Sequence, residues 1–487
     1  MAGLVGIIGR PQQTDTVEAM LNTIEHRGPD TVRVHRTEHF HGGVRASTLS
    51  APRGDGFAQD GVVAVLFDGD IYNQRDGQKS DAEVALELYK KYGRTFASHL
   101  EGVFACAIQD GDGVLLARDA VGVRPLYWGT TQAGNLCFAS EAKALVGLAD
   151  DVMELTPATT YSSKTGLAGY LPQYPCVSMG ASFNDAVEKL RKTMMQAVAR
   201  RLDDGAVGAC LLSGGLDSSI IAAVVKELGA DMPLITVGME GAPDLANAKL
   251  MAEHLGMEHH VLLYDAEEIR KSVPRAIWML ESFDEDCVSG AISNLFASAK
   301  ASEFTNCILS GEGGDELFGG YHLLKSLRSE AERLKMMERL IAIAYKTAVQ
   351  RLDRAMMGNS INYRTPFIDT EVIALALHIP VRWKIHDFGN GRLVEKYILR
   401  EAFKDLLPKK IYRREKLRFA AGTGTDNLMD DVAGSEADAA KFNETSKTTE
   451  EGYTLNSPKE LWYYRLFKEQ FPAPCFERLV GRWDPDK

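Results

Sequence analysis

The chain has 487 residues, 45% of them hydrophobic, so it is long enough for two or three folded domains. Its net charge of −12 argues against a nucleic-acid-binding surface. No apolar run reaches the ~18 residues of a membrane span, and no charged segment precedes an apolar core at the N-terminus, so we expect a cytoplasmic protein without a membrane segment. The seven cysteines show no Cys-x-x-Cys spacing, so neither a disulfide framework nor a zinc site is indicated, and most of them are expected to be small buried residues.

The first part of the chain is predicted to be rich in β-strands. Short apolar segments between Gly and Asp turns predict strands at residues 4–8, 62–67, 103–108, 114–117 and 136–139, with helices at 16–25 and 81–92. The pattern changes between residues 165 and 182. We therefore predict two domains, residues 1–170 and 171–487.

The second part alternates between helices and strands. A helix at residues 183–202 precedes strands at 207–212, 234–237, 260–263 and 307–309, with further helices between them. This alternation predicts a parallel sheet with a nucleotide at the carboxyl ends of its strands. From residue 324 onward the pattern is mostly helical, and the polar stretch 430–456 is predicted to be a surface loop or lid.

The turn between strand 207–212 and a helix predicted at 218–228 is the most informative segment. It reads Ser213-Gly214-Gly215-Leu216-Asp217-Ser218-Ser219. Glycines allow a close backbone approach, and hydroxyls with the first helical amides form an anion site. The lysine of a Walker A loop is missing. The alternative is a plain turn without a ligand. A carboxylate beside phosphates would repel them unless a cation lay between, so Asp217 predicts ATP together with Mg²⁺.

This loop resembles the pyrophosphate loop of ATP pyrophosphatases, and the whole chain resembles glutamine-dependent asparagine synthetases. The matching strings are His26-Arg27-Gly28-Pro29-Asp30, Gly69-Asp70-Ile71-Tyr72-Asn73, Ser80-Asp81, Arg118-Asp119, Ser140-Glu141-Ala142-Lys143-Ala144-Leu145, Ser310-Gly311-Glu312-Gly313-Gly314-Asp315-Glu316-Leu317-Phe318-Gly319-Gly320-Tyr321, Arg364-Thr365-Pro366-Phe367-Ile368-Asp369 and Lys396-Tyr397-Ile398-Leu399-Arg400. The resemblance implies an α/β fold. An N-terminal-nucleophile (Ntn) glutaminase-like α-β-β-α domain would precede an ATP-pyrophosphatase (adenine nucleotide α-hydrolase-like) parallel-sheet domain with a helical extension.

The resemblance also implies roles in the second domain. Asp217 and Asp315 would share Mg²⁺, and Lys416 would be the catalytic lysine that meets the charge of departing pyrophosphate. Without the resemblance, residues 310–321 could be an acidic surface turn. The favoured interpretation of residues 413–418 alone would be the solvated basic end of a helix. The implied ATP-binding residues are Leu211, Ser213, Gly214, Gly215, Asp217, Ser218, Ser219, Val237, Ser310 and Gly311.

Glu312 is expected to accept a proton from the attacking amine. Enzymes resembling β-lactam synthetase carry a tyrosine at this position and use it to deprotonate an internal amine. Glutamate at this position favours ammonia as the nucleophile.

The first domain departs from the glutaminase pattern. Family members begin Met-Cys-Gly, whereas this chain begins Met1-Ala2-Gly3 and so lacks the thiol nucleophile. The Asn-Gly-Glu string is Asp68-Gly69-Asp70, and an ionised Asp68 has no donor for an oxyanion. Arg45 and Asp81, which match residues that grip glutamine, are retained. An engineered Cys-to-Ala change would explain Ala2 but not Asp68, so we expect a natural loss of glutaminase activity and a vestigial pocket.

The predicted function is an ATP-dependent ligase that adenylates a carboxylate, with aspartate favoured, and transfers ammonia to it. Ammonia would come from solution or from a partner protein. The sequence is also compatible with a homodimer. Two alternatives from this family are an amide-forming enzyme of secondary metabolism that uses a substrate amine, and an ordinary glutamine-dependent asparagine synthetase. A catalytically silent binding or regulatory protein is a further alternative, which the retained Asp217, Asp315, Glu312 and Lys416 argue against.

Overall fold

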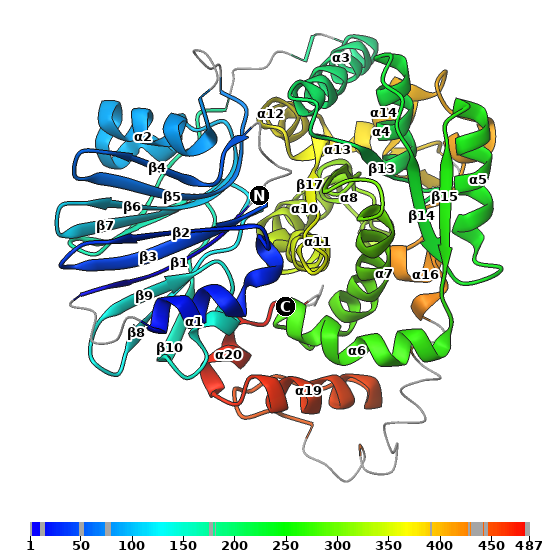
Figure 1. Cartoon of the computed structure of the whole chain (residues 1–487). Helices are drawn as coiled ribbons and strands as arrows, with labels where there is room; N and C mark the ends of the chain where they lie inside the picture. Colours follow the sequence, from blue (N-terminus) through cyan, green and yellow to red (C-terminus); the bar gives the residue numbers. More distant parts are fainter. Residues whose placement is uncertain are drawn as a thin grey trace.

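Two antiparallel sheets stack face to face in the N-terminal half, and helices surround a parallel sheet in the C-terminal half (Figure 1). The computed structural model describes residues 2–9, 15–47, 53–73, 79–174, 179–180, 182–389, 392–426, 429, 442 and 447–482. The predicted loop 430–456 lies outside these residues except for residues 442 and 447–456, where Thr448 and Thr454 form an isolated β-bridge.

Each antiparallel sheet has six strands. The first has the order β10-β8-β9-β1-β3-β2 and the second β12-β11-β7-β6-β5-β4. The elements are β1 (Ala2–Ile8), α1 (Asp15–Thr23), β2 (Thr31–Arg36), β3 (Phe40–Ala46), β4 (Phe57–Asp60), β5 (Val63–Ile71), α2 (Asp81–Tyr92), β6 (Gly102–Asp110), β7 (Gly113–Arg118), β8 (Tyr127–Thr131), β9 (Leu136–Ala139), β10 (Ala149–Glu154), β11 (Thr159–Ser162) and β12 (Gly166–Gly169).

Alternating side chains explain why the sheets lie between two helices. In β1, Leu4 packs in the core between the sheets, whereas Val5 packs on the opposite face in the cluster that contains α1. In β5, Leu66 faces the first sheet and Phe67 faces α2. Successive side chains of a strand point to opposite faces, so both sheets bury apolar residues on both sides. The predicted α-β-β-α sandwich is confirmed.

The sequence patterns located the central strands and both helices but missed the outer ones. β2, β3, β4, β8 and β10–β12 were not predicted. All except β11 contain Gly or charged residues that weaken the strand signal, and β11 consists of four hydroxyl-bearing residues without an apolar alternation. β5 also continues beyond the predicted residue 67, so Asp68, Gly69 and Asp70 lie within a strand rather than in a turn.

The C-terminal half is built on a parallel sheet, as predicted. In the described residues this sheet has five strands in the order β15-β14-β13-β16-β17. β17 was not predicted, because it is a three-residue segment with two polar side chains. The elements used below are α3 (Phe183–Leu202), β13 (Ala209–Leu211), α4 (Leu216–Glu227), β14 (Leu234–Gly238), α5 (Pro243–Leu255), β15 (His259–Leu263), α6 (Ala266–Leu280), α7 (Glu285–Ala301), β16 (Cys307–Leu309), α8 (Gly314–Phe318), α11 (Ala348–Met357), β17 (Asn362–Arg364), α14 (Tyr397–Phe403), α19 (Pro458–Gln470) and α20 (Pro474–Leu479).

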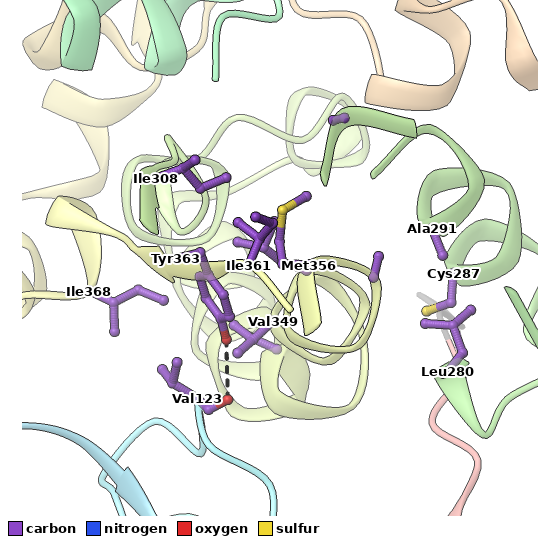
Figure 2. Packing of buried hydrophobic residues seen from close by; sticks show 14 of the residues in the cluster. Val123, Leu280, Cys287, Ala291, Ile308, Val349, Met356, Ile361, Tyr363 and Ile368 are labelled. Carbon is purple, nitrogen blue, oxygen red and sulfur yellow. Dashed lines mark hydrogen bonds between the residues drawn. The ribbon is translucent and has the colours of Figure 1, made fainter. Parts of the chain in front are cut away.

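A continuous apolar core joins α11 to its neighbours (Figure 2). Val349 and Met356 of α11 belong to the same buried cluster as Ile308 of β16 and Cys287 of α7. The Tyr363 hydroxyl of β17 donates to the Val123 carbonyl of the N-terminal half at 3.4 Å. Buried contacts therefore connect α11 and β17 to both halves of the molecule.

The last strand of the two stacked sheets ends at Gly169, and the next helix begins at Phe183. The domain division after residue 170 stays a prediction. The C-terminal α20 returns to contact β10 (Figure 1). None of the helices in the described part of the chain is long and apolar enough to span a membrane. The cysteines described are free and buried, as predicted, namely Cys106, Cys137, Cys210, Cys287, Cys307 and Cys475.

Candidate active site

The predicted ATP loop lies between β13 and α4. The Oγ atoms of Ser213 and Ser218 are 3.0 Å apart, and the Gly215 amide donates to the Ser213 Oγ at 3.3 Å. The helix begins at Leu216, two residues before its predicted start, so Asp217 lies in its first turn. Hydroxyls and free helical amides therefore gather at one helix N-terminus, as an anion site requires.

A second loop with acidic residues runs beside the ATP loop. β16 pairs with β13 in parallel, so residues 310–315 leave the sheet at the same edge as the ATP loop. A Cβ at Gly314 would lie 2.7 Å from the Asp217 carboxylate carbon, so glycine lets Asp217 approach the start of α8. Asp315, the next residue along α8, is thereby brought close to Asp217.

Two lysines contact these carboxylates. Lys396 Nζ contacts Asp217 and lies 2.6 Å from Asp315 Oδ1, and Lys416 Nζ lies 2.6 Å from Asp315 Oδ2. Although burial opposes ionisation, the two ammonium groups hold the pKa of Asp315 well below its usual range. Burial and the nearby charge of Asp315 raise the pKa of Asp217 despite Lys396. No role was predicted for Lys396, although the string that contains it was recognised.

The carboxylate pair fits a magnesium ion shared with phosphates. The Asp217 Oδ1 atom is buried and has no hydrogen-bond partner in the described structure. No cluster of three or more potential metal ligands occurs among the described residues. Mg²⁺ is commonly held by one or two carboxylates, with phosphate oxygens and waters completing its coordination. Asp217 and Asp315 supply such a partial set of ligands. Their negative charges also attract the ammonium groups of Lys396 and Lys416.

One cavity of about 190 Å³ contains most of the predicted site residues. It is lined by Leu211, Ser213, Gly215, Asp217, Ser218, Val237, Ser310, Gly311, Glu312, Asp315 and Lys416. Two predicted residues lie behind this lining. The Gly214 carbonyl accepts from Arg414 Nη1 at 2.6 Å, and Ser219 is fully buried in α4.

Glu312 faces an arginine that was not predicted. Arg351 Nη2 of α11 lies 3.3 Å from Glu312 Oε2, and both side chains line the cavity. Burial and the charges of Glu312 and Asp315 raise the pKa of Glu316 to about 7, and Tyr321 donates a hydrogen bond to this carboxyl. The cavity thus places a carboxylate and a guanidinium beside the ATP loop, and Tyr321, which also lines it, connects it to Glu316.

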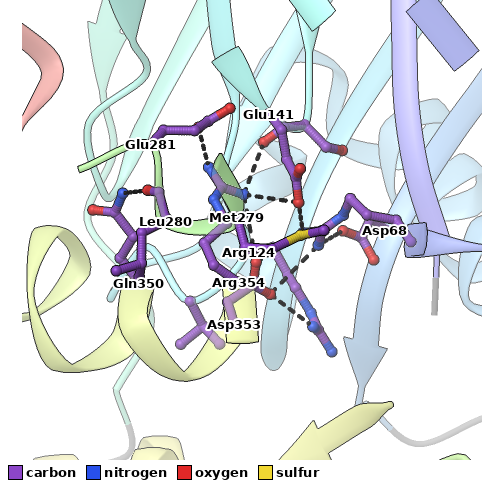
Figure 3. A network of polar contacts seen from close by, with 12 residues as sticks. Asp68, Arg124, Glu141, Met279, Leu280, Glu281, Gln350, Asp353 and Arg354 are labelled. Atoms are coloured by element: carbon purple, nitrogen blue, oxygen red, sulfur yellow. Dashed lines mark hydrogen bonds and ion pairs between the residues drawn. The ribbon is translucent and has the colours of Figure 1, made fainter. Parts of the chain in front are cut away.

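The residues of the predicted glutamine pocket lie in a network of buried ion pairs. Asp68 accepts from the Ala2 amide at 3.0 Å and from Arg27 Nη2 at 2.9 Å. Arg27 also contacts Glu141 and Asp353 at 2.9 and 2.8 Å. The same network includes Arg354, which contacts Glu281 at 3.0 Å (Figure 3). Arg27 thus compensates the charge of Asp68, which the sequence argument did not anticipate. Asp68 itself remains an acceptor.

Other residues of this pocket also serve the contact between the two halves. Asp70 pairs with Arg124 at 3.2 Å and with Arg364 of β17 at 3.0 Å. Despite burial, Arg364, Arg53 and Arg124 hold the pKa of Asp70 well below its usual range. The other recognised pocket residues have local partners. Arg45 donates to Asn22 at 2.7 Å, Asp81 lies 3.5 Å from Arg53, and Gly69 has a backbone φ of 153°.

Comparisons with known proteins agree with this architecture. The glutamine amidotransferase domain model matches residues 1–203, and the asparagine synthase model matches residues 189–347 and 325–472. The chain is 30% identical to asparagine synthetase [glutamine-hydrolyzing] 2 of Oryza sativa subsp. japonica, over 99% of this chain and 87% of the rice protein. It is also 30% identical to asparagine synthetase [glutamine-hydrolyzing] 2 of Arabidopsis thaliana, over 99% of this chain and 89% of that protein.

Among solved structures, the chain is similar to the glutamine phosphoribosylpyrophosphate amidotransferase from B. subtilis, complexed with ADP and GMP. The TM-score is 0.30 and the identity is 17%, over 53% of this chain and 80% of that chain. This likeness is too low to inform the site.

The fold defines a carbon–nitrogen ligase with an N-terminal glutamine amidotransferase domain and a C-terminal domain of the ATP-pyrophosphatase type. The family uses ATP, and the chain therefore has the architecture of an ATP-dependent amidoligase. With the asparagine synthase match extending over more than half of its length, this chain belongs to the asparagine synthase family.

Proposed function

We propose that this ligase adenylates the side-chain carboxylate of aspartate and transfers free ammonia to it, giving asparagine, AMP and pyrophosphate. The observation that carries the proposal is the joint placement of Asp217, Asp315, Glu312 and Lys416 around one cavity at the ends of adjacent parallel strands.

The proposed reaction has two steps. A carboxylate oxygen attacks the α-phosphorus of ATP, the bond to the β-phosphate breaks, and pyrophosphate leaves. Ammonia then attacks the acyl carbon, the bond to AMP breaks, and the nitrogen loses a proton. Asp217 and Asp315 would hold Mg²⁺, which would supply positive charge to the phosphates. Lys416 stabilises the departing pyrophosphate, and Glu312 accepts the proton.

Lys416 is expected to act mainly in the first step. Replacing it with Ala should lower the rate of pyrophosphate formation by about 10²–10³, because the charge that it meets is largest in the transition state. Binding of ATP should weaken much less. Single-turnover pyrophosphate release and equilibrium ATP binding distinguish the two effects. Equal losses in both would make Lys416 a residue for binding alone.

Free ammonia is the proposed nitrogen source because the first domain has lost glutaminase groups. Ala2 offers no nucleophile, and Asp68 is an acceptor that holds Arg27 and the Ala2 amide. Asp70 pairs with arginines, one of them from the other half. These contacts support a structural role of the first domain as a cap on the synthetase domain.

We expect the purified chain to form product with ammonium chloride but not with glutamine. The double change Ala2→Cys with Asp68→Asn should release measurable glutamate from glutamine, because it restores both a nucleophile and an oxyanion donor. Ala2→Cys alone should be weaker by about 10²–10³, the typical cost of one missing donor. Asp68→Asn alone is the matched control and should be inactive. Robust glutaminase activity in the unaltered chain would refute the loss.

A panel of carboxylic acids tests the substrate. Pyrophosphate release is measured with ATP, Mg²⁺ and each acid, with ammonium and without it. The proposal predicts the highest kcat/KM for aspartate with ammonium. Pyrophosphate release without ammonium, from an acid that carries its own amine, would instead support a ligase that uses a substrate amine. The missing glutaminase nucleophile favours this second candidate, since such a ligase needs no ammonia.

A further inference from the structure

Arg351 is a cavity residue with unused hydrogen-bonding capacity. Its Nη2 lies 3.3 and 3.5 Å from the two carboxylate oxygens of Glu312, which are long contacts for an ion pair. Its Nε is buried and has no hydrogen-bond partner within the described residues. A buried donor without a partner is costly, so this edge of the guanidinium is suited to a ligand in the cavity.

The other cations of the cavity already have carboxylate partners. Lys416 contacts Asp315, and Arg418 contacts Asp286 at 2.5 Å and Asp426 at 3.4 Å. Lys396, buried behind the lining, holds both Asp217 and Asp315. Arg351 thus differs from Lys416 and Arg418, the other basic residues that line the cavity, in having only long contacts to a carboxylate.

The neighbouring helix leaves room for the Arg351 side chain. A Cβ at Gly290 of α7 would lie 2.6 Å from Arg351 Cδ and 3.0 Å from Nη1. Any larger residue at position 290 would therefore displace the guanidinium. The backbone of α7 and the side chain of Glu312 together fix where Arg351 lies in the cavity.

The charge of the cavity argues for a specific anion contact. Five acidic and three basic residues of the described chain line it. A substrate that carries a second carboxylate would be repelled by this surface unless a cation contacted that group directly. A guanidinium binds a carboxylate through two parallel N–H donors, and in Arg351 such a pair is formed by the unpartnered Nε and by Nη2, whose contacts with Glu312 are long.

We propose that Arg351 binds the second, non-reacting carboxylate of a dicarboxylate substrate and thereby determines substrate specificity. The inference rests on the proposed function, because it takes the cavity to be the site where a carboxylate is adenylated. One carboxylate of the substrate faces the ATP loop, and the other lies against Arg351 beside Glu312. This arrangement also brings the acyl carbon close to the residue that accepts the proton.

Two pairs of acids test the inference, since the members of each pair differ only in the second carboxylate. They are L-aspartate with 3-aminopropanoate, and succinate with propanoate. Pyrophosphate release with ammonium should favour the dicarboxylate of at least one pair by about 10- to 100-fold in kcat/KM. Arg351→Gln should abolish this preference. Arg351→Lys should keep only part of it, since lysine retains the charge but lacks the two parallel N–H donors of the guanidinium.

Two further variants separate a specific contact from a general change in the cavity. Gly290→Ala should reduce the preference while the guanidinium is still present, because it displaces Arg351. Arg418→Gln removes a guanidinium that already has carboxylate partners and should leave the preference unchanged. Binding of succinate, measured by calorimetry in the presence of a non-hydrolysable ATP analogue, should weaken about 10- to 100-fold in Arg351→Gln.

The outcomes distinguish the inference from the function on which it rests. Equal use of both members of each pair by the unaltered chain, or an unchanged preference and unchanged succinate binding in Arg351→Gln, would overturn the inference while the ligase function stands. Arg351-dependent succinate binding without pyrophosphate release from any acid would support the contact and contradict the ligase function.

Discussion

Replacing Asp217 or Asp315 with Asn should lower ATP-to-pyrophosphate turnover by about 10³-fold or more. Each change removes a negatively charged oxygen ligand from the point where Mg²⁺ is expected, and a metal of this kind supplies several kcal/mol of charge stabilisation. The measurement is pyrophosphate release over a range of MgCl₂ concentrations. The apparent affinity for Mg²⁺ should fall together with the rate.

Asp286→Asn is the matched control, since this aspartate lines the same cavity but contacts Arg418. It should lose far less activity and keep its Mg²⁺ dependence. Circular dichroism should show that Asp217→Asn and Asp315→Asn are folded, since Lys396 retains one carboxylate partner in each. Unaltered turnover in either purified variant would remove both residues from the proposed metal site.

Replacing Asp353 with Asn should destabilise the protein by about 3–5 kcal/mol. Asp353 is 1% exposed and pairs with Arg27 and Arg124 of the N-terminal half. Removing its charge leaves two buried guanidinium groups undercompensated, which is the costly way to break a buried ion pair. Because the contact joins the two halves, unfolding in urea should also become less cooperative.

A surface pair provides the control for this effect. Asp405 lies 2.6 Å from Arg191, and its side chain is 57% exposed. Asp405→Asn should therefore change the free energy of unfolding by less than about 1 kcal/mol. If Asp353→Asn unfolded at the same urea concentration as the unaltered chain, the buried network could not be holding the two halves together.

The sequence predicted best where a local pattern determines the structure. The strand, turn and helix around Asp217 have a strong signal, because a buried strand, paired glycines and an apolar helical stripe follow one another within about twenty residues. The outer strand β10 was missed, since its charged residues interrupt any alternating apolar pattern, and β2 was missed although Val32 and Val34 alternate with polar residues.

The site residues that escaped prediction depend on distant contacts. Lys396 contacts Asp217, which is 179 positions away in the sequence. Its backbone is left-handed, with a φ of 54°, and a lysine in the sequence does not predict such a conformation. Arg351 of α11 reaches Glu312 across 39 positions, and Arg27 compensates the charge of Asp68 across 41 positions. The recognised string containing Lys396 was the available signal for that residue, whereas Arg351 lies outside every such string.

The source of the amide nitrogen is tested most directly by isotope transfer. The unaltered chain is incubated with ATP, Mg²⁺ and aspartate, together with either ¹⁵N-ammonium or glutamine labelled with ¹⁵N in its amide, and the product is analysed by mass spectrometry alongside pyrophosphate. An ammonia-dependent ligase should place the label from ammonium in the product, with one pyrophosphate for each amide formed, and none from glutamine. Efficient transfer of label from glutamine would contradict a vestigial glutaminase domain.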